Sequence, residues 1–306
     1  MMAAGYAHVG FVGLGMRGWT MARNLAAAGY ALTGHDADSE RSRRFASEHG
    51  GTAATCAGDF ASTAVVVTML PDDKTVQDAI LRWDGGIARA LPDGAVVVDM
   101  SSSNPVGTKE LGDQLAPLGV GLVDAPVSGG VSRAESGTLT LMIGSDDDNA
   151  VAQARGVLEV LGERLFRTGP LGSGHAMKAL NNFVGGGTYA LVVEALAIGR
   201  RYGLDPATMI DVMNTSTGRS FNTEVVVKDH VLTGAYATNF AVGLLAKDVG
   251  IAASLAQSSD VDAPLCDVVA QRWAEAAGGL GFSADHSEAH KHWWEGRLES
   301  VAEVTS

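Results

Sequence analysis

Two side chains with complementary chemistry, Lys178 and Asn182, stand four residues apart in a stretch without proline. Residues with this spacing lie on one face of an α-helix, about one turn apart. Burial beside an apolar wall lowers the pKa of a lysine amine, and the positive end of a helix dipole lowers it further. Such an amine can exchange a proton near neutral pH, while a nearby amide holds the reacting oxygen. We therefore predict that Lys178 is a general acid/base and that Asn182 is its catalytic partner.

A glycine-rich turn near the start of the chain has the pattern of a dinucleotide-binding loop. Glycines at positions 13, 15 and 18 follow a predicted strand, His8–Gly13, and precede a predicted helix, Trp19–Ala28. The first glycine permits a tight turn, the second lets the backbone approach a pyrophosphate, and the third lets the helix pack on the strand. The helix N-terminus then offers N–H groups to the phosphates. The predicted cofactor-binding residues of this loop are Gly13, Leu14, Gly15, Met16, Arg17 and Gly18.

Asp36 follows the next predicted strand, Ala31–His35. Its distance in sequence from the last glycine of the loop is close to the ~20 residues that are typical of a ribose-binding acid. Its carboxylate can accept hydrogen bonds from the adenosine ribose but repels a 2′-phosphate. NAD is therefore the favoured cofactor. Three nearby arginines leave NADP open as an alternative, although we interpret them as a solvated basic face of the following helix. They are Arg41, Arg43 and Arg44.

A second loop, Ser128-Gly129-Gly130, follows the predicted strand Gly121–Ala125. Open α/β folds bind their ligands beyond the carboxyl ends of the strands. Two successive glycines expose backbone N–H groups that can bind a carboxylate, and the serine hydroxyl adds a third donor. We predict that Ser128, Gly129 and Gly130 bind the substrate.

The elements that must position these residues form two groups. In the first half, short apolar runs alternate with amphipathic stretches, which is typical of a parallel sheet covered by helices on both faces. His175–Tyr202 then shows helical spacing over roughly 40 Å, and no convincing strand follows it. We predict a Rossmann-type, doubly wound parallel sheet in residues 1–168 and an all-α domain in residues 169–306, joined by a long helix at 175–202. The predicted strands are His8–Gly13, Ala31–His35, Ala64–Leu70, Ala95–Met100, Gly121–Ala125, Thr138–Gly144 and Arg164–Thr168.

Composition limits the classes of partner. The 35 acidic and 22 basic residues give a formal net charge of -13, which argues against nucleic acid and anionic membranes as partners and favours small molecules. The first residues lack the features of a signal peptide, and no uncharged apolar run reaches the ~20 residues of a membrane span. We expect a cytoplasmic protein. Cys56 and Cys266 are the only cysteines, and we expect both to be core thiols.

A histidine group near the end of the sequence has a spacing that metal sites use. It comprises His286, His290 and His292. These residues lie beside two tryptophans and outside the loops described above. We interpret the segment as a surface or subunit-contact helix and predict no metal site. His175 comes three residues before Lys178, and we predict that it lines the cleft without a catalytic role.

Four stretches together resemble the β-hydroxyacid dehydrogenase family, which includes 3-hydroxyisobutyrate dehydrogenases and tartronate semialdehyde reductases. They are Gly10–Gly18, Asp124–Gly130 followed by Gly137–Leu139, Gly172–Asn182 and Phe240–Asp248. Lys178 stands in the catalytic place of this family, whereas Arg17 stands where a methionine is usual. The resemblance implies that the helical domain forms homodimers or homotetramers. It also implies cofactor contacts by Leu70, Pro71, Ser102 and Lys247.

These observations predict NAD-dependent oxidation of a small 3-hydroxy acid, similar to 3-hydroxyisobutyrate, to its semialdehyde, or the reverse reduction. One alternative is an imine reductase-like NADP enzyme, a class that generally lacks lysine at the position of Lys178. Another is a non-catalytic dinucleotide-binding protein, which does not need Lys178, Asn182 and the Ser128 loop together. The sequence does not identify the acid. Candidates for its variable end are Arg219, Phe221 and Asn222. We expect Asp248 to have a structural pairing role, because it diverges from the helix face of Lys247.

Overall fold

The computed structural model describes residues 8–294. Its contacts divide the chain into two compact units, residues 1–178 and residues 179–306. The domain boundary that we expect between residues 168 and 169 stays a prediction.

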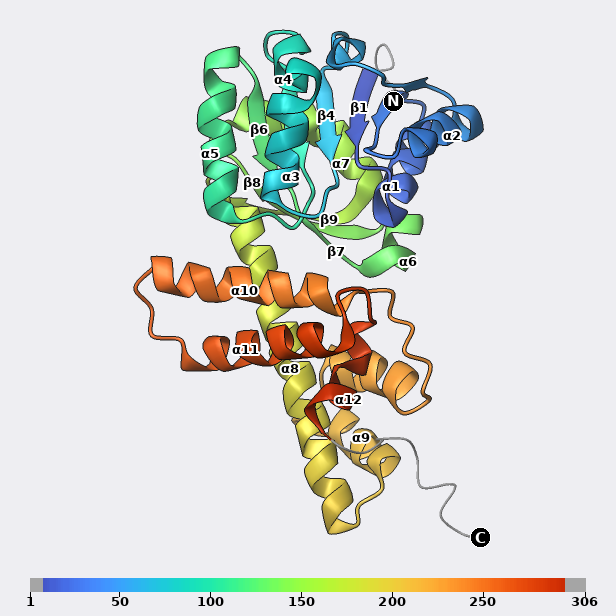
Figure 1. Cartoon of the computed structure of the whole chain (residues 1–306), viewed down its shortest axis with the longest axis vertical. Helices are drawn as coiled ribbons and strands as arrows, with labels where there is room; N and C mark the ends of the chain where they lie inside the picture. The colour runs from blue at the N-terminus through green and yellow to red at the C-terminus, as the bar shows by residue number, and fades with distance from the viewer. Residues whose placement is uncertain (1–7, 295–306) are drawn as a thin grey trace. The chain divides into compact units, whose positions relative to one another are not determined.

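A single sheet forms the centre of the first unit (Figure 1). The strand order is β3-β2-β1-β4-β5-β6-β8-β7, with β9 paired to β8. Pairing is parallel from β3 to β6 and between β8 and β9, but β8 runs antiparallel to β6 and β7. The strands are β1 His8–Val12, β2 Ala31–His35, β3 Thr52–Ala53, β4 Val65–Thr68, β5 Val96–Asp99, β6 Gly121–Asp124, β7 Val127–Ser128, β8 Leu139–Gly144 and β9 Gly162–Gly169.

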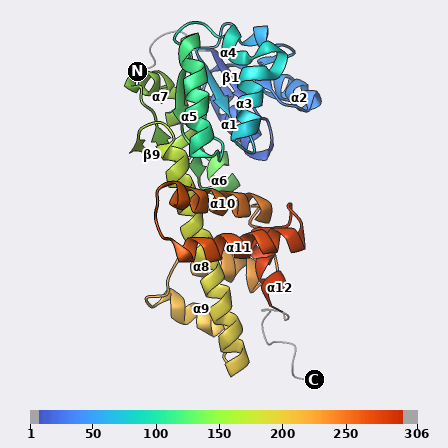
Figure 2. The same ribbon diagram turned by 60° about the vertical axis from the view of Figure 1, so that its left-hand side comes forward.

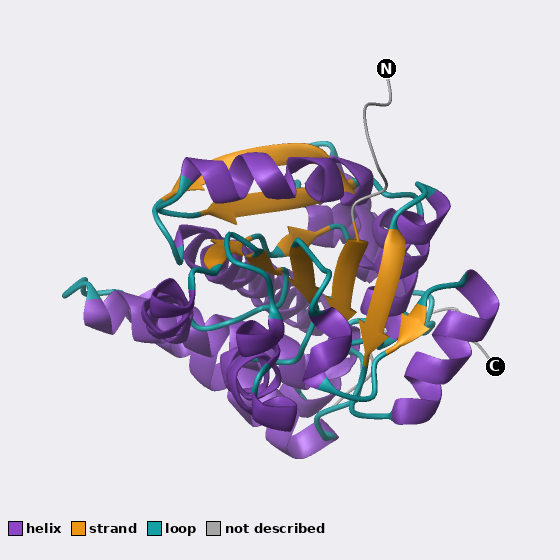
Figure 3. Ribbon diagram, turned by 90° about the horizontal axis from the view of Figure 1, so that it is seen from above, coloured by secondary structure: helices purple, strands orange, loops and turns teal. Residues whose placement is uncertain are grey.

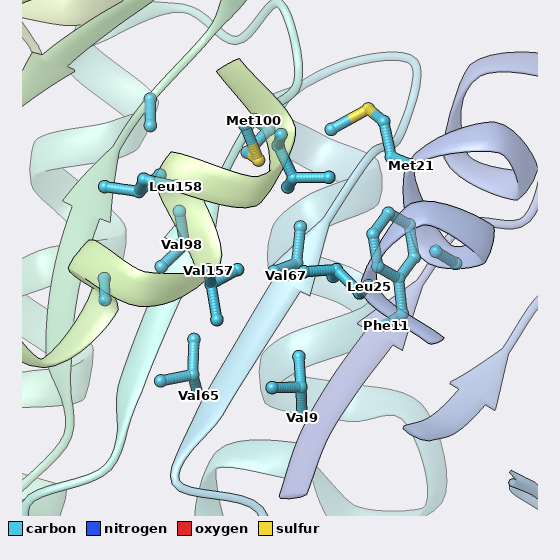
Figure 4. Packing of buried hydrophobic residues seen from close by; sticks show 14 of the residues in the cluster. Val9, Phe11, Met21, Leu25, Val65, Val67, Val98, Met100, Val157 and Leu158 are labelled. Atoms are coloured by element: carbon cyan, nitrogen blue, oxygen red, sulfur yellow. The ribbon is translucent and has the colours of Figure 1, made fainter. Parts of the chain in front are cut away.

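Helices cover both faces of this sheet (Figure 3). On one face, Val9 and Val67 pack against Leu25 of α1 and Val157 of α7 (Figure 4). The other face packs against α3, α4 and α5 through a separate apolar cluster. Each fully buried aliphatic side chain contributes about 1.5 to 3 kcal/mol, so two-sided burial explains the uniformly apolar strands. The helices are α1 Met16–Ala27, α2 Ser39–His49, α3 Asp73–Gln77, α4 Ile87–Ala90, α5 Pro105–Leu115, α6 Gly130–Glu135 and α7 Asp148–Leu161.

Acid and amide side chains begin several of these helices. Asp38, Asp72 and Asp147 each accept a hydrogen bond from a backbone N–H in the first turn of α2, α3 and α7, respectively. Asn104 does the same for α5, whose first residue is Pro105. These caps satisfy N–H groups that have no partner within the helix, and they fix where each helix leaves its loop.

The predicted doubly wound fold is confirmed, with two differences in detail. All seven predicted strands are present, but the two-residue strands β3 and β7 were not expected. The sheet is also mixed, because β8 pairs antiparallel with both β6 and β7. Thr138–Gly144 carries the same apolar pattern in either direction, so the pattern alone does not give the strand direction.

The second unit is helical, as predicted. In it, α10 and α11 lie side by side and cross α8 (Figures 1 and 2). Its core joins Val193 of α8, Ile210 of α9, Val249 of α10 and Trp273 of α11. The helices are α8 Ser173–Tyr202, which begins in the first unit, α9 Pro206–Asn214, a π-helical segment Asn222–Val231, α10 Val242–Ser258, α11 Pro264–Leu280 and α12 Ala289–Trp293.

Helix α8 is the one helix in the described residues that is long and apolar enough to cross a bilayer. Tyr189, Val193 and Leu196 are nevertheless buried in the core of the second unit, which is the situation of a core helix in a globular unit. The cysteines differ from each other: Cys266 is buried, as expected, whereas Cys56 is partly exposed. Burial raises the pKa of the Cys266 thiol, and Asp267 raises it further.

Candidate functional site

The loop between β1 and α1 is shaped by its glycines. Gly13 has a φ of +97°, and a Cβ there would lie 2.4 Å from the carbonyl oxygen of Met69. A Cβ at Gly18 would lie 1.8 Å from the carbonyl oxygen of Gly13. A Cβ at Gly15, in contrast, would meet no atom within 4 Å. Packing within the protein therefore requires the first and third glycines, while the second borders open space.

This open space lies at the N-terminus of α1. Gly15 caps the helix without a side-chain hydrogen bond, and the first turn contains no acidic residue. N–H groups in a first helical turn have no partner within the helix, and the helix dipole favours negative charge there. Together with the absence of a Cβ at Gly15, this arrangement fits a dinucleotide pyrophosphate. Met16 is 65% exposed beside it.

Asp36 closes the other side of the glycine loop. Its Oδ2 accepts a hydrogen bond from the N–H of Leu14 at 2.7 Å, and its Oδ1 accepts one from the N–H of Asp38 at 2.9 Å. The guanidinium of Arg41 lies 3.1 Å from Oδ1. Arg41 is exposed, as a residue of a solvated face should be, but its side chain also folds back onto Asp36. The neighbouring arginines instead pair along their own helix, Arg43 with Glu40 and Arg44 with Glu48.

The loops after β4 and β5 are tied to each other. The N–H of Leu70 donates to the hydroxyl of Ser101 at 2.9 Å, and the hydroxyl of Thr68 donates to Asp99 at 2.8 Å. These bonds hold the two strand ends where Pro71 and Ser102 follow. Sequence reasoning missed Asp99 and Ser101, since a buried acid at a strand end has no distinctive local pattern.

The predicted substrate loop combines a short strand with two glycines of positive φ. Ser128 ends β7 and is partly exposed. Gly129 and Gly130 have φ values of 138° and 68°, a region that favours glycine. A Cβ at Gly130 would meet nothing within 4 Å. The loop thus borders open space at Gly130, as carboxylate binding requires, whereas a Cβ at Gly129 would lie 2.7 Å from the side chain of Arg133.

Lys178 lies in the second turn of α8 and is buried, with 8% of its surface exposed. The helix start that carries it is held by Asp124 at the end of β6, which accepts hydrogen bonds from the N–H groups of Gly172 and His175. His175 is 1% exposed. Sequence reasoning did not identify Asp124 as a partner of this helix, because the contact joins residues 51 positions apart.

Three further predicted residues meet in the second unit. Nδ2 of Asn182 donates to Oδ2 of Asp248 at 2.6 Å, and Nζ of Lys247 lies 3.0 Å from Oδ1 of Asp248. Asp248 is 2% exposed and is thus a paired structural acid. Adjacent residues on a helix diverge, but the flexible lysine stem lets the Lys247 amine reach back to its neighbour.

The candidates for the variable end of the substrate differ in their contacts. Arg219 is exposed and pairs with Glu224 at 2.6 Å. Phe221 is 69% exposed. Asn222 is buried and donates to the carbonyl oxygen of Gly185 at 2.8 Å, so it has a structural bond to α8.

The histidine segment is only partly exposed: His292 lies at the surface, but the other two histidines do not. His286 and His290 are 8% and 1% exposed, and Tyr189 contacts both. Burial lowers the pKa of His286, and Asp285 opposes that shift. No group of three His, Cys, Asp or Glu side chains in residues 8–294 is arranged to hold a metal ion. Our surface interpretation is wrong for His286 and His290 because their partners lie far away in the sequence.

Comparisons with known proteins cover both units. Residues 8–169 match the family model described as the NAD binding domain of 6-phosphogluconate dehydrogenase. Residues 172–293 match the model described as the NAD-binding domain of NADP-dependent 3-hydroxyisobutyrate dehydrogenase.

Individual relatives match over most of their length. The chain is 32% identical over 287 residues to 2-(hydroxymethyl)glutarate dehydrogenase of Eubacterium barkeri, covering 94% of each protein. It is 33% identical over 264 residues to NAD-dependent L-serine dehydrogenase of Pseudomonas aeruginosa, covering 84% of this chain and 88% of the relative. The solved structure of Mycobacterium tuberculosis 3-hydroxyisobutyrate dehydrogenase with L-serine has a TM-score of 0.83 at 26% identity, covering 95% of this chain and 100% of that one.

Proposed function

This chain belongs to the β-hydroxyacid dehydrogenase family, and on that premise we propose that it oxidises a small 3-hydroxy acid to its semialdehyde, or catalyses the reverse reduction. The observation that carries the proposal is Lys178, a lysine buried in the second turn of α8. Burial of a charged amine is costly, and proton transfer gives an amine at this position a functional reason.

Oxidation of the alcohol removes one hydride and one proton. A bound nicotinamide accepts the hydride. Lys178 takes the hydroxyl proton as general base and returns it as general acid in the reverse direction. Asn182, four residues further along α8, holds the reacting oxygen. Its amide has a second N–H for this task, since Asp248 accepts from only one N–H, while the amide oxygen accepts from Nδ2 of Asn181 at 3.3 Å.

NAD is the proposed cofactor, with NADP as the alternative. The glycine loop, with residues 13–18, binds the pyrophosphate, and Asp36 accepts hydrogen bonds from the ribose. Arg41 favours NADP, because its guanidinium lies 3.1 Å from Asp36 and could turn toward a 2′-phosphate. The further proposed cofactor contacts are Leu70, Pro71, Ser102 and Lys247.

Ser128, Gly129 and Gly130 are the proposed binding site for the substrate carboxylate. Two relatives carry names or titles that refer to L-serine, which is itself a 3-hydroxy acid. The proposed substrate class is therefore a small acid with a hydroxyl on the third carbon. Neither nucleic acid nor a membrane surface is a proposed partner, given the net charge of -13.

The second unit is the proposed site of homodimer or homotetramer formation. Three aliphatic side chains on one side of α8 are exposed: Val184 by 63%, Leu191 by 71% and Ile198 by 66%. Exposed aliphatic side chains along one helix face are typical of a protein interface. A cytoplasmic location stays a prediction.

A substrate screen tests this function. Purified protein is mixed with 3-hydroxyisobutyrate, glycerate, threonate, 3-hydroxypropionate or L-serine, each with NAD and with NADP, and absorbance of the reduced nicotinamide is followed. We expect turnover with at least one acid. Reduction of cyclic imines by NADPH without any hydroxy-acid turnover would indicate an imine reductase, and tight NADH binding without any turnover would indicate a non-catalytic protein.

A further inference from the structure

Two buried carboxylates lie next to each other at the carboxyl ends of neighbouring strands. Asp99 ends β5 and Asp124 ends β6, and the two are partners in the register of the parallel pair. They are 2% and 0% exposed. Neither belongs to the proposed cofactor or substrate loops. Because burying a charge is costly without compensating hydrogen bonds, their protein partners indicate what they do.

Asp124 holds the start of α8. Its Oδ1 accepts a hydrogen bond from the N–H of Gly172 at 2.8 Å, and its Oδ2 accepts one from the N–H of His175 at 2.9 Å. N–H groups in a first helical turn have no partner within the helix, and negative charge there is favourable. Both oxygens of one side chain thus fix this turn to β6.

His175 adds a second anchor in the same turn. Its Nδ1 lies 2.8 Å from the hydroxyl oxygen of Thr108 in α5. Since that hydroxyl donates to the carbonyl oxygen of Asn104 at 3.1 Å, it accepts from Nδ1. The Nε2 atom, which has no hydrogen bond among the described residues, lies 3.6 Å from Oδ2 of Asp99. The ring therefore joins α8 to α5.

Gly174 shows how closely this turn is packed. A Cβ there would lie 2.2 Å from the carbonyl oxygen of Met142 in β8 and 2.7 Å from Oδ2 of Asp124. The first turn is thus in contact with β6, β8 and α5. Lys178 follows His175 by three residues on the same helix face, so a shift of this turn moves the Lys178 amine.

We propose that Asp124 is a positioning residue for Lys178, acting through the first turn of α8, with His175 as the second anchor. The proposal rests on the proposed function, in which Lys178 transfers the proton. A displacement of about 1 Å can cost about 100-fold in rate. The side chains of Asp124 and His175 are not part of the proposed dinucleotide and carboxylate sites. Their removal should therefore lower kcat and leave KM largely unchanged.

The variant Asp124→Asn tests this proposal, because it keeps the volume and replaces one acceptor oxygen by an NH₂ group. We expect kcat to fall about 10- to 100-fold, with KM and the Kd of NADH changed less than about threefold. The matched control is Asp147→Asn, which removes a capping carboxylate from α7 in the same unit and should leave kcat within about twofold. An unchanged kcat in Asp124→Asn, or an equal loss in both variants, would overturn the proposal.

A pair of His175 variants decides the question if Asp124→Asn does not fold. His175→Gln keeps an N–H donor for the hydroxyl of Thr108. His175→Leu keeps a side chain of similar size but removes the donor. We expect kcat to fall about tenfold in the leucine variant and to recover to within about threefold of wild type in the glutamine variant. Equal losses in the two variants would contradict a positioning role.

One measurement does not depend on turnover. Acetylation of Lys178 by N-acetoxysuccinimide is followed by peptide mass spectrometry, relative to the exposed Lys228, in wild type and in the Asp124 and His175 variants. We expect the relative rate at Lys178 to change at least threefold when an anchor is removed. If wild type turns over no hydroxy acid but this rate responds, the proposed function fails and the positioning role stands. An unchanged rate refutes the positioning role whatever the activity.

Discussion

Asp248 accepts a hydrogen bond from Asn182 at 2.6 Å and pairs with Lys247 at 3.0 Å from its other oxygen. One buried acid thus orients two of the residues proposed for catalysis and cofactor binding. Only the NH₂ group of Asn182 can donate to a carboxylate, so this contact fixes which way the amide points.

Removal of this acid should affect both stability and rate. We expect Asp248→Ala to lower the free energy of unfolding by about 2 to 3 kcal/mol, because it leaves the buried amide of Asn182 without its acceptor. Asp248→Asn retains one oxygen for Asn182 and should cost about 1 kcal/mol. Urea denaturation measures both values. Equal losses in the two variants would contradict the proposed pairing.

Lys178→Ala should lower kcat at least ~100-fold, the smaller end of what loss of an acid/base costs. NADH binding, measured by fluorescence, should change little because the glycine loop is intact. Lys228→Ala, which removes an exposed lysine, is the control and should keep full activity. Full activity in Lys178→Ala with NAD still bound would show that another group transfers the proton.

Two glycines of the cofactor loop should respond in opposite ways to alanine. Gly15→Ala places its Cβ where no atom lies within 4 Å, so we expect unchanged stability but at least tenfold weaker NADH binding. Gly18→Ala forces a contact of 1.8 Å with the carbonyl oxygen of Gly13 and should lower the melting temperature by several degrees. Thermal denaturation and NADH titration of both variants separate the two effects. Normal NADH binding by Gly15→Ala would mean that the open space is not a phosphate site.

Asp36→Asn should shift cofactor preference toward NADP. The carboxylate repels a 2′-phosphate, and its removal also frees Arg41 to bind that phosphate. We expect the ratio of the NADPH Kd to the NADH Kd to fall about tenfold. The control is Glu40→Gln, which removes a nearby acid that pairs with Arg43 and should leave the ratio unchanged. A constant ratio in Asp36→Asn would remove Asp36 from the cofactor site.

The stability of the second unit should depend on pH through His286. Burial lowers the pKa of His286 below its ordinary value of 6.5, so the unfolded chain binds the proton first as pH falls. The contribution of this neutral histidine is fully present above about pH 6.5 and is lost as pH falls through the lower, folded-state pKa. His286→Gln removes this dependence. Urea denaturation at pH 7.5 and 5.5 should show a smaller pH effect in the variant than in wild type, since all other titrating groups are common to both.

The sheet could be predicted because each central strand is buried on both faces: Val65–Thr68 is buried throughout and begins with three valines. Contacts between polar residues that lie far apart in the sequence could not be predicted. Asp124 and His175 are 51 positions apart, and Asn182 and Asp248 are 66 apart. Arg41 has the spacing of a surface residue, yet Asp36 attracts its guanidinium. His286 and His290 have polar neighbours in sequence, and only the folded chain shows that Tyr189 contacts both.

The position of β1 between β2 and β4 has a consequence for synthesis of the chain. Gly13 packs against the carbonyl of Met69, just beyond β4, and β1 pairs with residues 65–68. A ribosome must therefore release the chain well past residue 69 before the nucleotide-binding turn can take its final shape. Pairing between such distant segments forms slowly, so the glycine turn matures only after β4 has been released and paired.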